Sequence, residues 1–193
     1  CLIGGIDPAS RGVYSQRHFD SAKTKYKGCD FSKYKCVFID SITIASKICL
    51  NWCKAQPESF SEKSGKPDTR AAYGLLASEM SMWINQFQHI PDKDVIFVGL
   101  LDEKTDDFNK TSWVMQIEGA KTAVELPGIL DEVISMVPLK DESGKLERKF
   151  ICTTLNRGGF PAKDRSGKLL EVEEAHLGKL LQKIKSSTMK GAK

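Results

Sequence analysis

Two short segments carry residue types that could act on a nucleotide. The first, CVFIDS, is an apolar run that ends in Asp40 and Ser41. Because the carboxyl ends of parallel strands face the crevice in which α/β folds bind ligands, a carboxylate there can hold Mg²⁺, commonly through water. Ser41 can add a hydroxyl. The alternative is that Asp40 or Ser41 only caps the following helix, and the motif by itself favours this alternative.

The second segment, AKDRSGK, places two cations two residues apart. Lys163 and Arg165 point the same way if the segment is extended, because side chains along an extended chain alternate with a period of two. An ammonium and a guanidinium together suit a phosphate group. The alternative is a solvated turn with charges on both sides.

A nucleotide site also needs a loop that holds the phosphates, with the pattern GxxxxGK[ST]. The chain has three Gly-Lys pairs, and the residues that follow them are Pro67, Leu146 and Leu169. None of the pairs is followed by the hydroxyl that the pattern requires, so these 193 residues contain no such loop.

The composition is that of an ordinary globular protein, with 40% apolar residues, 28% charged residues and a net charge of +4. No run approaches about 18 apolar residues, so we expect no membrane span and a cytoplasmic location. The charge permits binding of nucleic acid without arguing for it. The six cysteines form no CxxC pair and the three histidines are scattered, so we expect reduced thiols rather than a zinc site.

Apolar periodicity predicts strands and helices in alternation. We predict strands over 36–40, 94–101 and 148–155, a turn at 141–145, and helices over 41–55, 69–90 and 173–184, with a weaker helix over 15–27. The segment 129–139 leads into a further strand, which forms an antiparallel-looking hairpin with 148–155. Strand–helix–strand units followed by such a hairpin indicate an α/β domain with a mostly parallel sheet. We expect a single domain over 1–185, followed by a basic tail over 186–193.

In this order and at this separation, the two segments resemble the RecA-core ATPases. The closer resemblance is to phage and prophage ATP-binding proteins related to the phage single-strand-annealing ATPases. It covers most of residues 35–185, including FIDSITIASKICLNW, VIFVGLLDEKTDDFN and FPAKDRSGKLLEVEEAHLGKLL. It implies a three-layer RecA-like P-loop NTPase core, truncated at its N-terminus, whose phosphate-binding loop and first strand lie upstream of Cys1.

The resemblance also implies roles for named residues. Asp40 would be the Walker B acid that orients Mg²⁺, with Ser41 as its neighbour. Asp102, next to Glu103, would lie where the superfamily places a γ-phosphate sensor. Lys163 and Arg165 would reach the ATP of an adjoining subunit in trans, as an arginine finger does. The implied cofactors are ATP and Mg²⁺, bound with the upstream loop present, and the implied assembly is a homo-oligomer.

Two polar segments, 56–70 and 103–125, fall where RecA-type proteins contact DNA. The second carries aromatic rings that could stack on bases and cations that could neutralise phosphates. The candidates for binding single-stranded DNA are Phe108, Lys110, Trp113 and Lys121. Six acidic residues in or beside this segment oppose such binding, and the alternative for Trp113 is a packing or subunit contact.

The sequence therefore predicts the C-terminal part of a phage-type RecA-like ATP-binding protein. It would act in DNA recombination or replication, with Mg-ATP bound between subunits. The alternative is a non-catalytic, prophage-derived module that binds DNA or protein without ATP. A third interpretation is an acylated lipoprotein that begins at Cys1, although the disulfide-poor composition favours a fragment.

Overall fold

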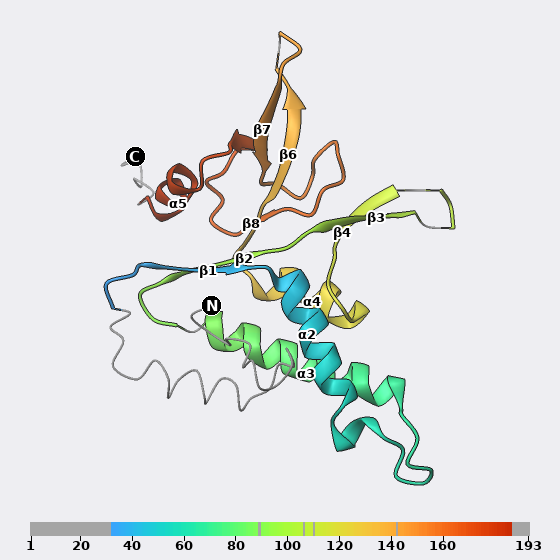
Figure 1. Cartoon of the computed structure of the whole chain (residues 1–193). Coiled ribbons are helices and arrows are strands. Elements are labelled where there is room, and N and C mark those ends of the chain that lie inside the picture. Colours follow the sequence, from blue (N-terminus) through green and yellow to red (C-terminus); the bar gives the residue numbers. More distant parts are fainter. Residues whose placement is uncertain (1–31, 89, 106, 110, 142, 187–193) are drawn as a thin grey trace, which may run out of the picture. The chain divides into compact units, whose positions relative to one another are not determined.

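The computed structural model describes residues 32–88, 90–105, 107–109, 111–141 and 143–186. They form two compact units (Figure 1). The first comprises the residues up to Leu101 together with Met115–Leu126, and the second comprises Asp102–Val114 together with the residues from Pro127 onward. The helix predicted over 15–27 and nearly all of the basic tail lie outside the described residues.

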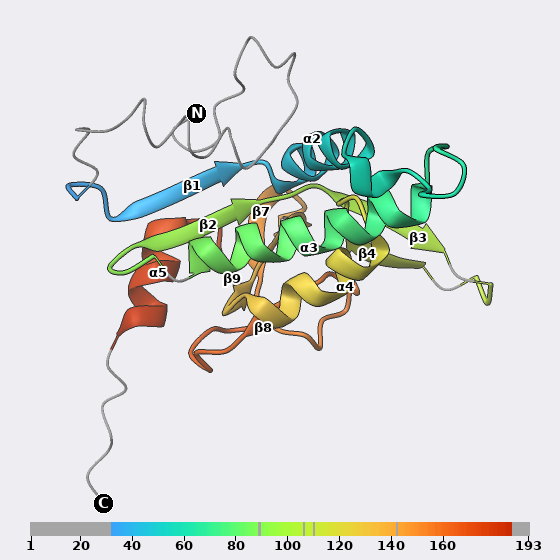
Figure 2. The same cartoon turned by 90° about the horizontal axis from the view of Figure 1, so that it is seen from below.

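The first unit is built on two parallel strands. Strand β1 (Cys36–Asp40) pairs with β2 (Asp94–Val98), and the pairing ends with Asp40 opposite Val98. Helix α2 (Ile42–Lys54), the short 3₁₀ turn η2 (Pro57–Ser59) and helix α3 (Thr69–Gln88) connect the strands. Figure 2 shows β1 and β2 side by side. The carboxyl ends of both strands therefore meet at one edge of this small sheet.

The core of the first unit lies between α2 and α3. Helix α3 buries one residue about every fourth position, which is the spacing of a single helix face. The buried side chains are Ala72, Leu76, Met80, Ile84 and Phe87 on α3, and Ile42, Cys49, Leu50 and Cys53 on α2. Edge-on contacts among the rings of Trp83, Phe87 and Phe97, with centroids 5.2 to 5.9 Å apart, join α3 to β2.

The second unit is mostly antiparallel. Strands β3 (Leu101–Thr105) and β4 (Thr111–Met115) form a hairpin whose first and last residues group with the first unit. After helix α4 (Ala120–Ile129), strand β5 (Glu132–Val133) pairs with β8 (Lys163–Asp164). Strands β6 (Ser135–Lys140), β7 (Leu146–Ile151) and β9 (Val172–Glu174) form a three-stranded sheet, and helix α5 (Leu177–Lys185) follows it.

The structure confirms the α/β class and a parallel pair of strands, but its sheets differ from the expected one. Within the described residues, the parallel sheet has two strands, and β5–β8 and β6–β7–β9 are antiparallel. The apolar run 94–101, predicted as one strand, ends as β2 at Val98. A Cβ on Gly99, just after β2, would lie 3.1 Å from Ile42 Cγ2 and 3.2 Å from Met115 Sδ, so a side chain there would have to displace these neighbours by a few tenths of an ångström.

No helix within the described part of the chain is both long and apolar enough to cross a membrane.

Candidate functional site

Asp40 occupies the position that the sequence predicted for it. It is the last residue of β1, it is exposed, and no described residue donates a hydrogen bond to its carboxylate. The neighbouring Ser41 is the N-cap of α2, where its hydroxyl accepts a hydrogen bond from Ile44 N (3.3 Å). The capping alternative therefore holds for Ser41, while the Asp40 carboxylate is available to a ligand.

Two buried hydroxyls on α2 fix the surroundings of this edge. Thr43 Oγ1 accepts a hydrogen bond from Leu100 N (3.0 Å), just after β2. Ser46 Oγ donates to Thr43 O (2.9 Å) and accepts from Glu118 N (3.0 Å), just before α4. Because buried polar groups are costly to leave unpaired, these bonds hold the segments that follow β2 and precede α4 against α2.

In AKDRSGK, the ammonium of Lys163 caps a helix. Lys163 Nζ donates hydrogen bonds to Pro127 O (2.8 Å) and Leu130 O (2.6 Å), with Gly128 O at 3.5 Å. The last carbonyls of a helix have no intrahelical donor, and a cation there is favoured by the helix dipole. The group that the sequence assigned to a neighbour's phosphate thus stabilises the end of α4.

Lys168 makes the same kind of contact with α5. Its Nζ donates to Ile184 O (2.5 Å) and to Ser186 O, at the end of that helix. Both lysines of the segment therefore have structural contacts.

Arg165 differs from these lysines. Its Nη1 lies 2.5 Å from Asp131 Oδ1, and both side chains are exposed, at 56% and 65% respectively. Ion pairs between exposed side chains contribute at most about 1 kcal/mol. The guanidinium can leave Asp131 at small cost, so Arg165 is the cation of this segment that is suited to reach another molecule.

The turn beneath Arg165 is fixed by two carboxylates. Glu132 accepts hydrogen bonds from Arg165 N (3.2 Å) and Ser166 N (3.1 Å). Asp164 accepts from Ser166 Oγ (2.6 Å), Gly167 N (3.0 Å) and Leu169 N (2.8 Å). Burial alone would raise the pKa of Asp164, but these hydrogen bonds outweigh it and hold the pKa below its ordinary value. Arg165 therefore has a flexible side chain on a fixed backbone.

Comparison with protein families identifies the chain. A family model described as an AAA domain matches residues 15–166, which include β1 and most of AKDRSGK. The chain belongs to the AAA domain family. This is a family of P-loop NTPases, so the chain has an α/β nucleotide-binding domain, and the family generally uses ATP and Mg²⁺. Searches of the curated proteins and of the solved structures found no match.

The acidic pair of this AAA domain does not lie where the resemblance placed it. Asp102 and Glu103 were expected to close the strand that begins at Asp94. That prediction of the strand is wrong, because β2 ends at Val98 and both acids lie inside β3, where they are exposed. Asp102 thus follows β2 by a short connection and lies on the next strand, and its role as a γ-phosphate sensor stays a prediction.

The predicted DNA contacts are spread over the β3–β4 hairpin and α4. Phe108 is 89% exposed at the hairpin tip. The ring of Trp113 stacks on Phe160, with centroids 5.5 Å apart and planes at 24°, which is a packing contact. Lys110 lies outside the described residues, and the structure describes the backbone of Lys121 in α4 but not its side chain. Contact of these residues with DNA stays a prediction.

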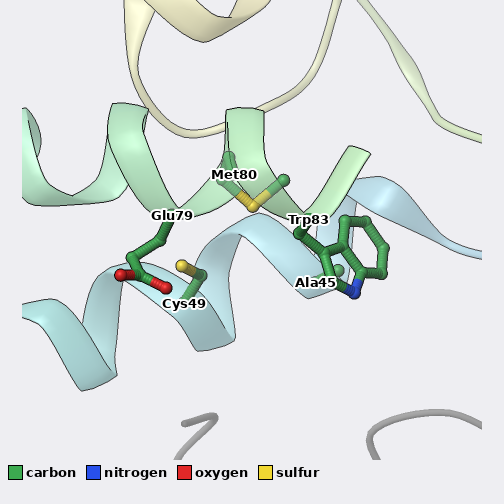
Figure 3. A pocket seen from close by; sticks show the side chains of 5 residues that line it. All are labelled: Ala45, Cys49, Glu79, Met80 and Trp83. Atoms are coloured by element: carbon green, nitrogen blue, oxygen red, sulfur yellow. The ribbon is translucent and has the colours of Figure 1, made fainter. Parts of the chain in front are cut away.

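Sequence analysis did not foresee a small pocket between α2 and α3 of the AAA domain. Ala45 and Cys49 line it from α2, and Glu79, Met80 and Trp83 line it from α3 (Figure 3). A hydrogen bond with Cys53, burial and the nearby Glu79 raise the pKa of the Cys49 thiol far above its ordinary value. Since thiolates rather than thiols react and bind metals, this shift disfavours reaction at Cys49.

Glu79 gives the pocket a testable pH dependence. Burial raises the pKa of Glu79 above its ordinary 4.5. Because the folded pKa exceeds the unfolded one, the folded state loses stability as pH rises from the unfolded pKa through the folded pKa. Glu79→Gln removes this loss. We expect its stability relative to the wild type to increase between about pH 4 and about pH 7, by less than about 1 kcal/mol, since the carboxyl is only partly buried.

Urea denaturation at both pH values measures this difference. The same substitution at the exposed Glu62 is the control, and an equal pH dependence in both variants would contradict the burial of Glu79.

Proposed function

We propose that this AAA domain is the C-terminal part of a phage-type RecA-like ATP-binding protein that binds Mg-ATP between subunits. The observation that carries the proposal is the exposed Asp40 carboxylate at the carboxyl edge of β1 and β2. Mg²⁺ prefers oxygen ligands and keeps part of its water shell, which fits a single carboxylate facing solvent. The ordered helix start at Ser41 keeps that carboxylate at the edge of the sheet.

The other parts of the site come from elsewhere in the proposed assembly. No GxxxxGK[ST] pattern occurs in these 193 residues, so we propose that residues preceding Cys1 in the intact protein supply the phosphate-binding loop. ATP would supply the transferable phosphoryl group. Arg165 of one subunit would reach the nucleotide of the next, since among the described residues its guanidinium pairs with the exposed Asp131 alone. Lys163 would support that turn from the end of α4.

Calorimetry with Mg-ATP tests the proposal on this chain and on a chain extended upstream through the phosphate-binding loop. We expect binding by the extended chain alone. In that chain, Asp40→Asn is expected to weaken Mg-dependent binding about tenfold, because Asp40 holds the ion through water. The control is Asp92→Asn, which removes the same charge before β2, at a positive φ that Asn tolerates. Equal affinities of the two variants would contradict the role of Asp40.

A second candidate is a non-catalytic module that binds DNA or protein without ATP. If neither the chain nor its extended form binds Mg-ATP, this candidate replaces the first.

Recombination or replication of phage DNA is the process that we propose for the intact protein, on the strength of the resemblance. Single-stranded DNA would be its partner, with Phe108 as the exposed aromatic contact. The acidic residues around Phe108 disfavour such a contact.

A further inference from the structure

One face of the β6–β7 hairpin combines apolar side chains with cations. The register pairs Met136 with Phe150, Pro138 with Arg148 and Lys140 with Leu146. Because side chains alternate along a strand, these residues share one face, and the opposite face packs into the core through Val137, Ile151 and Ala162. We define the outer face by its exposed members, Met136, Pro138, Lys140, Leu146 and Arg148.

The outer face exposes large apolar side chains, which indicates a binding surface. Met136 is 56% exposed and Leu146 is 63% exposed. Contiguous apolar patches rimmed by polar residues on a protein surface mark sites of interaction. Phe150, at the base of the same face, is half-buried against the cluster formed by Cys152, Leu169 and Leu180. The part left exposed is therefore the half of the hairpin nearer its turn, together with Met136.

The cations of the outer face are not compensated within the described residues. No described acid forms an ion pair with Lys140 or Arg148. On the opposite face, by contrast, Lys149 Nζ lies 3.0 Å from Glu147 Oε2. The outer face thus presents two positive charges between apolar side chains, which complements a partner that is both acidic and apolar.

The partner would meet this face and not the edge of the sheet. Strand β6 lies at the edge of the sheet β6–β7–β9, where a further strand could pair. Pro138, in the middle of β6, has no backbone N–H to donate, and proline is one way in which edge strands avoid pairing. Side chains of the outer face are therefore the recognition elements.

The chain itself carries a hairpin of the complementary kind. The sequence 102–110, which follows the first residue of β3 and precedes β4, contains four acids and two lysines. Glu103 and Asp107 are exposed, and Phe108, between them and β4, is 89% exposed. Nucleic acid fits the outer face less well, because single-strand sites rely on aromatic rings that stack on bases, and the exposed members of this face include none.

We propose that the outer face of β6–β7 binds the β3–β4 hairpin of a second copy of the chain. Phe108 packs on Pro138, which lies between Met136 and Leu146 on this face. Lys140 and Arg148 pair with Glu103 and Asp107. The two surfaces are different, so the contact is heterologous and repeats from subunit to subunit in a ring or filament. This inference deepens the proposed function and rests on its requirement for adjoining subunits.

Charge exchange tests the contact on the full chain. The variant Lys140→Glu/Arg148→Glu makes both surfaces acidic, and Glu103→Lys/Asp107→Lys makes both basic. Each variant alone is expected to self-associate about a hundredfold more weakly than the wild type, because like charges then meet. An equimolar mixture is expected to recover the association, because every contact again joins opposite charges. Sedimentation velocity without nucleotide measures all three samples.

A control variant with the same change in net charge, and an assay of DNA binding, complete the test. Lys47→Glu/Lys54→Glu changes the net charge equally on exposed positions of α2 and is expected to associate like the wild type. A monomeric wild-type chain, or a mixture that fails to associate, overturns the proposal. So does a Lys140→Glu/Arg148→Glu variant that loses binding to an oligo(dT) strand and keeps its association. Mg-ATP binding, measured separately, decides the proposed function independently of this contact.

Discussion

Arg165→Ala, made in a chain extended through its phosphate-binding loop, is expected to keep Mg-ATP affinity and to lose at least about a thousandfold in kcat. Arginine fingers supplied from a neighbour contribute effects of this size because they stabilise charge on the phosphoryl group in the transition state. Arg165 can provide such a charge, because its present partner is the exposed Asp131 and the turn that carries it is fixed by Asp164 and Glu132. Steady-state ATPase assays and calorimetry give kcat and affinity separately.

Subunit mixing separates action in trans from action within one subunit. Arg165→Ala is expected to be inactive alone, and Asp40→Asn is expected to retain about a tenth of the activity at Mg-ATP concentrations well below its Kd. In a mixture, some interfaces combine an intact Asp40 with an intact Arg165 from the neighbour, and part of the activity returns. Asp131→Asn serves as the control for loss of the ion pair and is expected to retain activity. If the mixture stays inactive while the two variants co-assemble, Arg165 does not act across the interface.

Lys163→Met is expected to lower the free energy of unfolding by about 2 kcal/mol, since hydrogen bonds that involve a charged group contribute about 1.5 to 3 kcal/mol. The substitution keeps the aliphatic stem and removes the ammonium that binds Pro127 O and Leu130 O. Those carbonyls then lie without a donor at the end of α4. Urea denaturation provides the measurement, and Lys145→Met, at a side chain that is 73% exposed, is the control.

The two cations of AKDRSGK are expected to differ in their contribution to stability. Arg165→Ala is expected to change stability by less than about 1 kcal/mol, as the loss of an exposed ion pair does. If Lys163→Met proves as stable as the wild type, the cap contributes nothing. That result would instead favour the role that the resemblance implies, in which Lys163 acts with Arg165 on the phosphate of a neighbouring subunit.

The local pattern of the sequence was sufficient for the elements around Asp40. An apolar run that ends in Asp-Ser predicts β1 and a carboxylate at its end. The spacing of Leu76, Met80, Trp83 and Phe87 predicts the inner face of α3, and all of these are buried except Trp83, which is half-buried. The spacing of Ile44, Ile48 and Trp52 predicts an inner face of α2 that is wrong in part, because Ile44 is 52% exposed while Cys49 and Cys53 are buried. Thiols pack as small hydrophobes, so the pattern permitted either face.

Contacts between distant residues account for what the sequence could not predict. Nothing in the spacing of Lys163 and Arg165 indicates that one binds carbonyls more than 30 residues away. The close approach of Ile42 and Met115 to Gly99, just after β2, also brings together residues from separate segments. The sequence shows that the β3–β4 segment is acidic. Which residues of β6 and β7 share the complementary face follows only from the register of that hairpin.

The stack of Trp113 on Phe160 gives the chain a built-in optical probe. The three tryptophans are divided between the two compact units, with Trp52 and Trp83 in the first and Trp113 in the second. Indole emission responds to its immediate surroundings, so each unit has its own fluorophore. A Trp113→Phe chain would show the melting of the first unit alone, and its difference from the wild-type curve would reveal whether the two units unfold together or one after the other.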